Sequence, residues 1–217
     1  MMTSLFSSFD PSTNLYQMNW MMMMMVTMIL PMNFWLNKSR WTTMKNNLEK
    51  KIYKEMMNVT NHKEMIILSM STFMFIMTNN LMGLVPYNFT STSHMALNMS
   101  MALPIWLSMI VYSWINHTNK MFSHILPKGT PSMIMPMMII IETIGILIRP
   151  ISLSVRLMAN MIAGHLLMTL LGNNNQIQMM TLILPIQMML VSFETCISMI
   201  QAYVFSTLIT LYSSESP

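Results

Sequence analysis

Two long apolar stretches near the end of the chain, residues 136–171 and 176–212, limit the folds that this sequence can adopt. Runs of this kind predict membrane helices, because a helix satisfies its own backbone polar groups where no water is present. As a helix each stretch would be ~54 Å long, whereas the hydrocarbon core of a bilayer is ~30 Å thick. Pro150 or Pro185 could break a stretch into two shorter helices, but the one strong turn signal is GNNN at 172–175. We therefore expect two long, steeply tilted helices that form a hairpin.

The composition also indicates a membrane protein. Only 8% of the 217 residues are charged, against roughly 25% in soluble domains. The net charge of +4 would suggest a nucleic-acid partner in a soluble chain. Here the basic residues flank apolar spans, so membrane topology explains them and no nucleic-acid partner is expected. The single cysteine, Cys196, allows no disulfide within the chain. The predicted fold class is an all-α membrane protein.

Three further apolar spans precede the long stretches, at residues 18–36, 65–85 and 95–115. Each is about as long as the ~20 residues that one crossing needs. Between the first two, residues 38–58 carry lysines around apolar residues that recur three and four apart. That pattern favours an amphipathic helix on the membrane surface, with a solvated charged loop as the alternative. We therefore expect one membrane domain over residues 1–217, with five crossings and one surface helix.

The placement of basic residues predicts an orientation. With five crossings, residues 37–61 and 116–131 lie on one side of the membrane and hold nearly all the lysine and arginine. The other side holds residues 1–17, 86–93 and 172–175, which contain none. The positive-inside rule then predicts an outer N-terminus and an inner C-terminus.

One charge in the first long stretch needs a specific explanation. Arg156 stays protonated under essentially all conditions. A charged arginine at the bilayer centre costs from ~3 kcal/mol on insertion scales to ~10–17 kcal/mol in simulations. Such a charge indicates an ion pathway or a counter-charge to a partner.

Other polar residues share this stretch. Glu142, Arg149 and Arg156 are spaced seven apart, which returns a straight helix to within ~20° of one face. Asn160 follows Arg156 by four residues and is its neighbour on that face. His165 lies nine residues beyond Arg156, about half a turn around and ~13 Å along the axis. The glutamate and the histidine thus lie toward opposite ends of the helix, with the arginine between them.

The second long stretch adds Glu194 and Gln201, seven apart on one face. Together these residues suit a proton path, because glutamate and histidine bind and release protons. A fixed positive charge between them would repel a passing proton and favour the ionised form of a partner's carboxylate. The alternative is that the polar residues pair and hold two helices together. That alternative is open for Gln201 and Asn160 and weakest for Arg156.

The remaining histidines suggest no site. They lie in loops or at span ends, and we expect surface positions without a functional role for His62, His94, His117 and His124. Their spacing is not a zinc pattern. No phosphate-binding loop, nucleophile elbow or HExxH motif is present, so no catalytic residue, cofactor site or metal site is expected.

The segment SVRLMANMIAGHLL, preceded by IIIETIGILIRP, closely resembles subunit a of F-type ATP synthases in its mitochondrial form. The later Glu194 and Gln201, the basic amphipathic segment and LMGLVPYNFT at residues 81–90 fit the same family. The resemblance covers nearly the whole chain. It implies that Arg156 is the family's essential arginine and Asn160 the asparagine near it.

The resemblance also implies roles for the other polar residues. His165 and Glu194 match the pair that lines the half-channel open to the intermembrane space, and Glu142 matches an acidic residue of the matrix half-channel. Gln201 matches the glutamine packed close to the arginine. Arg149 lies where relatives vary and receives no role. The implied partners are the c-ring, whose subunits each carry one membrane carboxylate, other Fo and peripheral-stalk subunits, and the lipid bilayer.

The expected function is that of a non-catalytic stator subunit in the mitochondrial inner membrane. Its two offset half-channels would pass protons to and from the c-ring, with the N-terminus toward the intermembrane space and the C-terminus toward the matrix. A secondary transporter is an alternative, but it should show two related halves with paired broken helices, and none are visible. A structural subunit of a respiratory complex is another, and it would not need Arg156 in the bilayer.

Overall fold

The computed structural model describes residues 5–12, 17–31, 34, 36–60, 62–86, 88–126, 131, 133–173 and 180–215. Every regular element in that part of the chain is a helix. The α-helices are α1 (Met21–Ile29), α2 (Arg40–Val59), α3 (Lys63–Gly83), α4 (Met95–Asn116), α5 (Thr118–Ile125), α6 (Met135–Asn173) and α7 (Met180–Glu215). Three short 3-10 turns complete the set, namely η1 (Leu5–Phe9), η2 (Met18–Trp20) and η3 (Ser91–Ser93).

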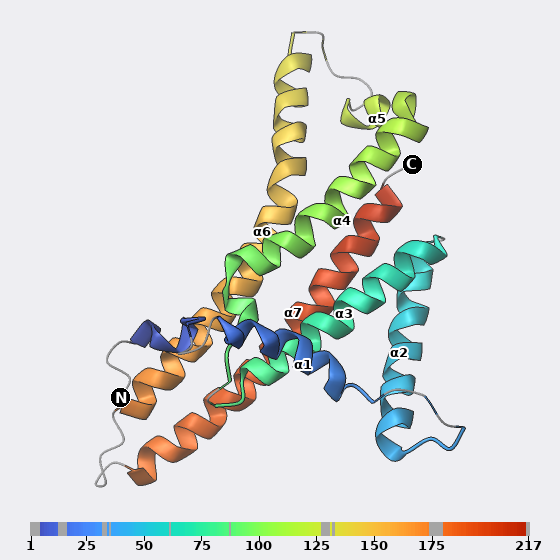
Figure 1. Cartoon of the computed structure of the whole chain (residues 1–217). Coiled ribbons are helices and arrows are strands. Elements are labelled where there is room, and N and C mark those ends of the chain that lie inside the picture. The colour runs from blue at the N-terminus through green and yellow to red at the C-terminus, as the bar shows by residue number, and fades with distance from the viewer. Residues whose placement is uncertain are drawn as a thin grey trace.

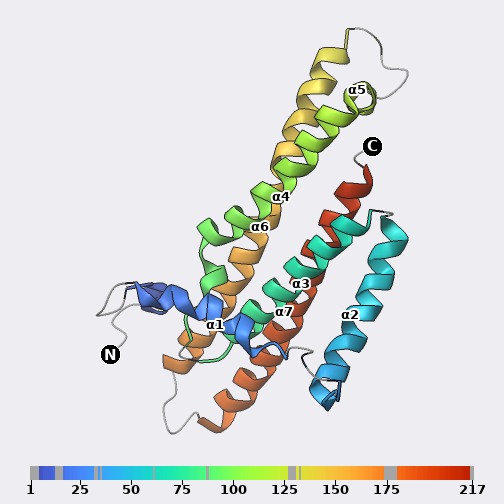
Figure 2. The same ribbon diagram turned by 45° about the vertical axis from the view of Figure 1, so that its right-hand side comes forward.

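The two long helices are continuous. α6 has 39 residues and α7 has 36, and they pass through Pro150 and Pro185 without ending. Figures 1 and 2 show α6 and α7 lying close together at the end near residue 173 and diverging toward the other end. α4 packs along α6 and α3 packs along α7, so four long helices form one bundle.

An apolar cluster holds this bundle together. Its buried members come from all four helices: Phe73, Ile76, Ala102, Met109, Leu153, Leu157, Ala202, Phe205 and Ile209. Buried hydroxyl groups lie among them and donate hydrogen bonds to carbonyls of their own helix. Ser154 donates to Ile151 at 2.9 Å, and Ser206 donates to Tyr203 at 2.9 Å. Small residues that satisfy their own polar groups allow helices to pack closely inside a membrane.

The region of the first predicted span, 18–36, is helical over a shorter length than expected. Helical structure ends at Ile29, because Leu30 adopts an extended conformation (ψ 123°) before Pro31. Residues 32, 33 and 35 of this span lie outside the described residues. Among those described, four helices are long and apolar enough to cross a membrane, namely α3, α4, α6 and α7. The fifth predicted crossing is not confirmed.

The basic segment predicted at 38–58 forms α2. Ser39 caps its start, with its hydroxyl accepting a hydrogen bond from the backbone N–H of Thr42 at 3.3 Å. Near its end Met56 is buried against Ser69 of α3. The apolar side chains toward the start of the helix remain exposed, as they would for a helix in contact with lipid: Trp41, Met44 and Leu48.

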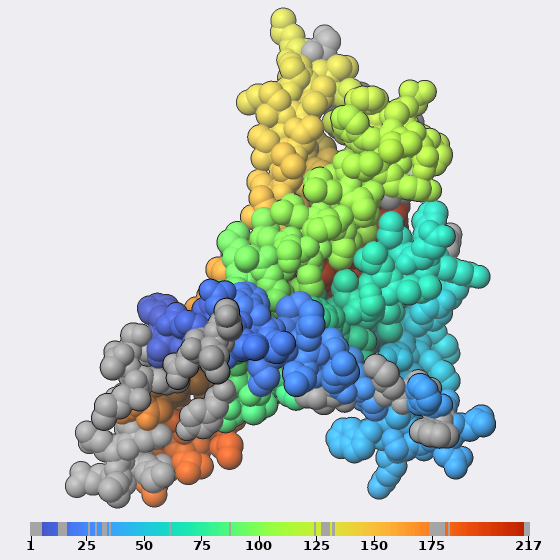
Figure 3. Space-filling view, viewed as in Figure 1, coloured from blue at the N-terminus to red at the C-terminus, as the bar shows by residue number. Residues whose placement is uncertain are grey.

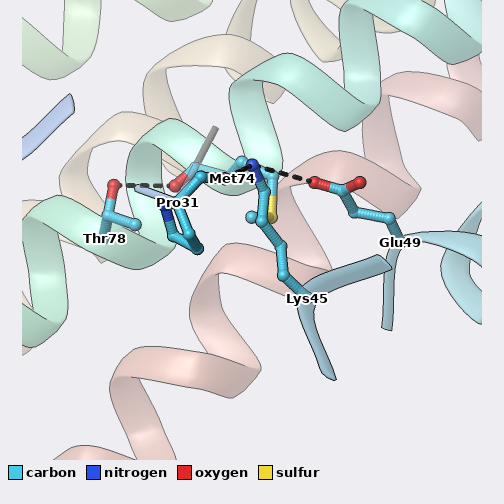
Figure 4. A network of polar contacts seen from close by, with 5 residues as sticks. All are labelled: Pro31, Lys45, Glu49, Met74 and Thr78. Atoms are coloured by element: carbon cyan, nitrogen blue, oxygen red, sulfur yellow. Dashed lines mark hydrogen bonds and ion pairs between the residues drawn. The ribbon is translucent and has the colours of Figure 1, made fainter. Parts of the chain in front are cut away.

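Two polar contacts tie α2 to its surroundings. The Lys45 ammonium lies 3.7 Å from the Glu49 carboxylate and donates a hydrogen bond to the Pro31 carbonyl at 3.2 Å (Figure 4). At the other end, the Tyr203 hydroxyl donates to the Glu55 carboxylate at 3.1 Å. The first contact holds the chain that leaves α1, and the second joins α2 to α7.

Candidate functional site

Two cavities lie where α6 and α7 approach each other. The inner cavity has a volume of about 300 Å³ and is walled by α3, α6 and α7. The outer cavity, of about 1010 Å³, is walled by α6, α7, the N-terminal residues and the loop after α3. Glu194 and Leu84 line both cavities, so these two residues lie where the cavities adjoin.

The position of the Glu194 carboxyl depends on Gly164 of α6. A Cβ atom placed on Gly164 would lie 2.8 Å from Cδ and 2.9 Å from Oε1 of Glu194. Real Cβ contacts are essentially never below 3.0 Å, so the carboxyl group occupies space that any other residue at 164 would fill. The lack of a side chain therefore lets an acidic group of α7 lie directly against the backbone of α6.

His165 is the residue next to this close approach, and it lines the outer cavity. Its Nε2 atom and the Oε1 atom of Glu194 are buried without a hydrogen-bond partner among the described residues. Buried polar atoms without protein partners are rare, and a cavity beside them indicates that water completes their hydrogen bonds.

The inner cavity brings together Asn160 and Gln201, which the sequence had placed on the two long helices. Asn80 of α3 also lines it. This side chain is 1% exposed, and its Oδ1 has no hydrogen-bond partner among the described residues. From the sequence we expect Asn80 to contact protein rather than lipid, which its burial confirms, but we expect no part for it in the site. An asparagine close to a glycine, here Gly83, near the end of an apolar span was the available signal.

Arg156 lies outside both cavities, on a part of α6 that is exposed in this chain. It makes no ion pair within the described part of the protein. Asn160, one turn further along, is exposed as well and also lines the inner cavity. An unpaired charge on an apolar helix is a strong indication of a partner from another chain.

Glu142 is separate from this group. It lies 23 residues before His165 on the same unbroken helix, which corresponds to ~35 Å along the axis. Between them, the guanidinium of Arg149 lies 5.0 Å from the centre of the Tyr212 ring, which joins α6 to the end of α7.

The structure thus brings His165, Glu194, Asn160 and Gln201 around two adjoining cavities and leaves Glu142 at a distance. No cluster of three metal-ligating acid, histidine or cysteine side chains occurs among the described residues.

A model of the family described as "ATP synthase A chain" matches residues 15–214. The chain belongs to this family. It is 48% identical over 224 residues to the ATP synthase subunit a of Locusta migratoria and 47% identical over 222 residues to that of Drosophila melanogaster. It is 46% identical over 224 residues to that of Anopheles quadrimaculatus. Each match covers 99% of both chains. The resemblance based on SVRLMANMIAGHLL is therefore confirmed.

The contact between Gly164 and the Glu194 carboxyl can be tested by mutation in the assembled ATP synthase. Gly164→Ala should displace the Glu194 carboxyl and slow proton movement about tenfold or more, because small misplacements at a reacting group are that costly. The measurement is ATP-driven acidification of vesicles that hold the assembled complex. Gly145→Ala on the same helix is the matched control, since its added Cβ would meet nothing within 4 Å. Equal rates in the two variants would contradict the proposed importance of this contact.

Proposed function

We propose that the chain is the proton-translocating stator subunit of an F-type ATP synthase, a multi-pass protein of the mitochondrial inner membrane that exchanges protons with the c-ring. Membership of the ATP synthase A chain family supports this function. The supporting structural observation is the position of Glu194 between two cavities, one reaching outward past His165 and one reaching Asn160 and Gln201. The chain itself carries out no covalent chemistry.

The proposed inward path uses groups that can change protonation or hold water. A proton enters the outer cavity, binds at His165 or Glu194, and moves through water in the inner cavity past the amides of Asn160 and Gln201. Amide side chains do not titrate, but they donate and accept hydrogen bonds and can therefore hold water in line. The path ends at the exposed part of α6, where a c-ring carboxylate would take up the proton.

Arg156 is proposed to separate the two half-channels. Its charge is fixed, so it repels a passing proton and stabilises the ionised form of the carboxylate that reaches it. The absence of an ion pair to Arg156 within the described residues supports a carboxylate from the c-ring as its partner. That partner would offset the cost of leaving a guanidinium in hydrocarbon.

Glu142 is proposed to line the second half-channel, toward the matrix. Its distance from His165, ~35 Å along α6, supports two openings that are offset from each other. A helix of 39 residues is ~58 Å long, so it fits ~30 Å of hydrocarbon only if inclined by roughly 50–60° from the membrane normal. Ordinary spans tilt by 0–40°, and we propose that the curved face of the c-ring holds α6 and α7 at the larger angle.

For the topology we propose five crossings, with α1 and its flanking apolar residues as the first. In Figures 1 and 2 α1 runs across the direction of α2. If α1 follows the membrane normal, α2 lies in the plane of the surface and its exposed Trp41, Met44 and Leu48 face lipid. The N-terminus then faces the intermembrane space and the C-terminus the matrix. The exposed apolar side chains elsewhere would contact lipid, other Fo subunits and the peripheral stalk.

The central assignment predicts the effect of replacing the arginine. Arg156→Ala should abolish coupled proton transport and ATP synthesis while the complex still assembles. Arg156→Lys should fail as well, because an ammonium can lose its proton when desolvated and lacks the planar guanidinium. Arg40→Ala, at the exposed start of α2, is the control and should keep normal rates. Full ATP-driven pumping by either Arg156 variant in reconstituted vesicles would refute the assignment.

The orientation predicts which cysteines a membrane-impermeant thiol reagent can reach. In a Cys196→Ser background, cysteines at the exposed positions Thr118 and Ser123 should resist the reagent in intact mitoplasts and react once the inner membrane is opened. A cysteine at the exposed Ser12 should react in both conditions. Labelling of Thr118 and Ser123 positions in intact mitoplasts would reverse the proposed orientation.

A further inference from the structure

The N-terminal residues form one wall of the outer cavity. η1 packs against α6, and the residues of this segment that line the cavity are Ser7, Ser8, Asp10 and Ser12. Figure 3 shows the blue N-terminal part of the chain lying across the front of the molecule, next to the green of α4. The opening through which protons would reach His165 is therefore bordered by a segment far from it in sequence.

Specific contacts hold this segment against the cavity. The ring of Phe9 meets the ring of His165 edge to face, with centroids 6.1 Å apart. The Phe9 carbonyl lies 3.0 Å from Nε2 of His94, and the Asp10 carbonyl accepts a hydrogen bond from the Asn19 side chain at 3.4 Å. Because a carbonyl can only accept, Nε2 of His94 must carry the hydrogen of its bond. His94 thus fixes the backbone immediately before Asp10.

His94 is itself held in place by neighbouring rings. Its ring lies 5.1 Å from that of Trp20 and 5.3 Å from that of Phe89, and these two rings are 5.5 Å apart. Aromatic contacts at such distances favour a defined ring orientation. The sequence analysis expected His94 to be a surface residue without a role. In the structure it is half-buried and connects α4 to the N-terminal segment.

Asp10 is the charged side chain among the N-terminal residues that line the outer cavity. It is the only aspartate, glutamate, lysine, arginine or histidine among the first 37 residues. The ionisable residues among those described around the outer cavity are Asp10, His165 and Glu194. Asp10 is exposed, whereas the other two are partly buried. An acidic group at the mouth of a cavity raises the local concentration of cations and the rate at which they arrive.

We propose that Asp10 is a proton-collecting residue at the mouth of the outer cavity and that His94 is its positioning residue, acting through the Phe9 carbonyl. The inference rests on the proposed function as a proton-translocating subunit. The Asp10 carboxylate takes a proton from hydronium or a protonated buffer and releases it through cavity water to His165 or Glu194. One carboxylate is protonated and then regenerated in each transfer.

The first experiment varies the supply of protons. In vesicles that hold the assembled complex with this face accessible to the medium, Asp10→Asn should lower inward proton flow about tenfold when mobile buffer is scarce. Abundant small buffer should restore the rate, because buffer can then deliver protons directly. Asp10→Glu should behave like the natural protein, and Glu64→Gln, which removes an exposed carboxylate at the start of α3, should have no effect. Normal flow in Asp10→Asn, or a loss that buffer does not relieve, overturns the proposal.

The second experiment tests the role of His94. His94→Ala should reproduce the buffer-dependent loss, while His94→Gln should largely restore flow, because its amide can still donate to the Phe9 carbonyl. Combining His94→Ala with Asp10→Asn should add no further loss, as expected for residues that act through one group. Additive losses, or normal flow in His94→Ala, would overturn the positioning role. His94→Gln keeps this test valid even if the alanine variant fails to assemble.

Arg156→Ala in the same vesicles distinguishes a failure of proton collection by Asp10 from a failure of the proposed function. If Arg156→Ala abolishes ATP-coupled proton flow while Asp10→Asn remains normal, collection by Asp10 is wrong and the proposed function stands. If ATP-coupled flow is normal in Arg156→Ala as well, the proposed function itself is wrong.

Discussion

The arrangement of the site depends on the close approach of α6 and α7 at Gly164. A glutamate carboxyl lies against bare helix backbone there, at distances that no side chain at position 164 would permit. This one contact places Glu194 where the outer and inner cavities adjoin. A wider separation of the helices would remove this contact between the carboxyl and the α6 backbone, and a side chain at position 164 would take up the carboxyl's space. The separation of the two helices therefore decides whether an ionisable group can stand between surface and interior.

The buried polar groups of the bundle include some that hydrogen-bond within the protein and some without a partner among the described residues. Buried hydroxyls in the apolar core, such as Ser206, bond to carbonyls of their own helix and need no water. Among the described residues, the unpartnered buried atoms of Asn80, His165 and Glu194 belong to residues that line the two cavities, whereas those of Thr92 and Asn98 do not. In hydrocarbon an unsatisfied polar group costs several kcal/mol. Water in the two cavities would remove that cost for Asn80, His165 and Glu194.

The predictions from sequence were most accurate for features that depend on a single helix. Apolar length predicted the long helices α6 and α7, and spacing along α6 placed Arg156 between Glu142 and His165. It was less accurate where separate segments meet. Periodicity assigns a residue to a face of its own helix but does not tell which neighbour that face meets, so Asn80 was not assigned to the site. The contact of Phe9 with His165 joins residues 156 positions apart, and no local pattern encodes it. In the described part of the first predicted span the helix α1 ends at Ile29, because Leu30 is extended before Pro31, which hydrophobicity alone does not predict.

The continuity of α6 has a mechanical consequence. α6 is one helix from Met135 to Asn173, and although Pro150 donates no backbone hydrogen bond the helix has no terminus there, so the spacing of its polar groups is set by backbone geometry. A loop in the middle would let that spacing fluctuate. α4 supports the helix along one side and α7 along another, and the contact of Arg149 with Tyr212 joins α6 to the end of α7. A sideways force applied at Arg156 would therefore be distributed over α4, α6 and α7. The rigid α6 could thus resist the force exerted by a neighbouring subunit that rotates against it.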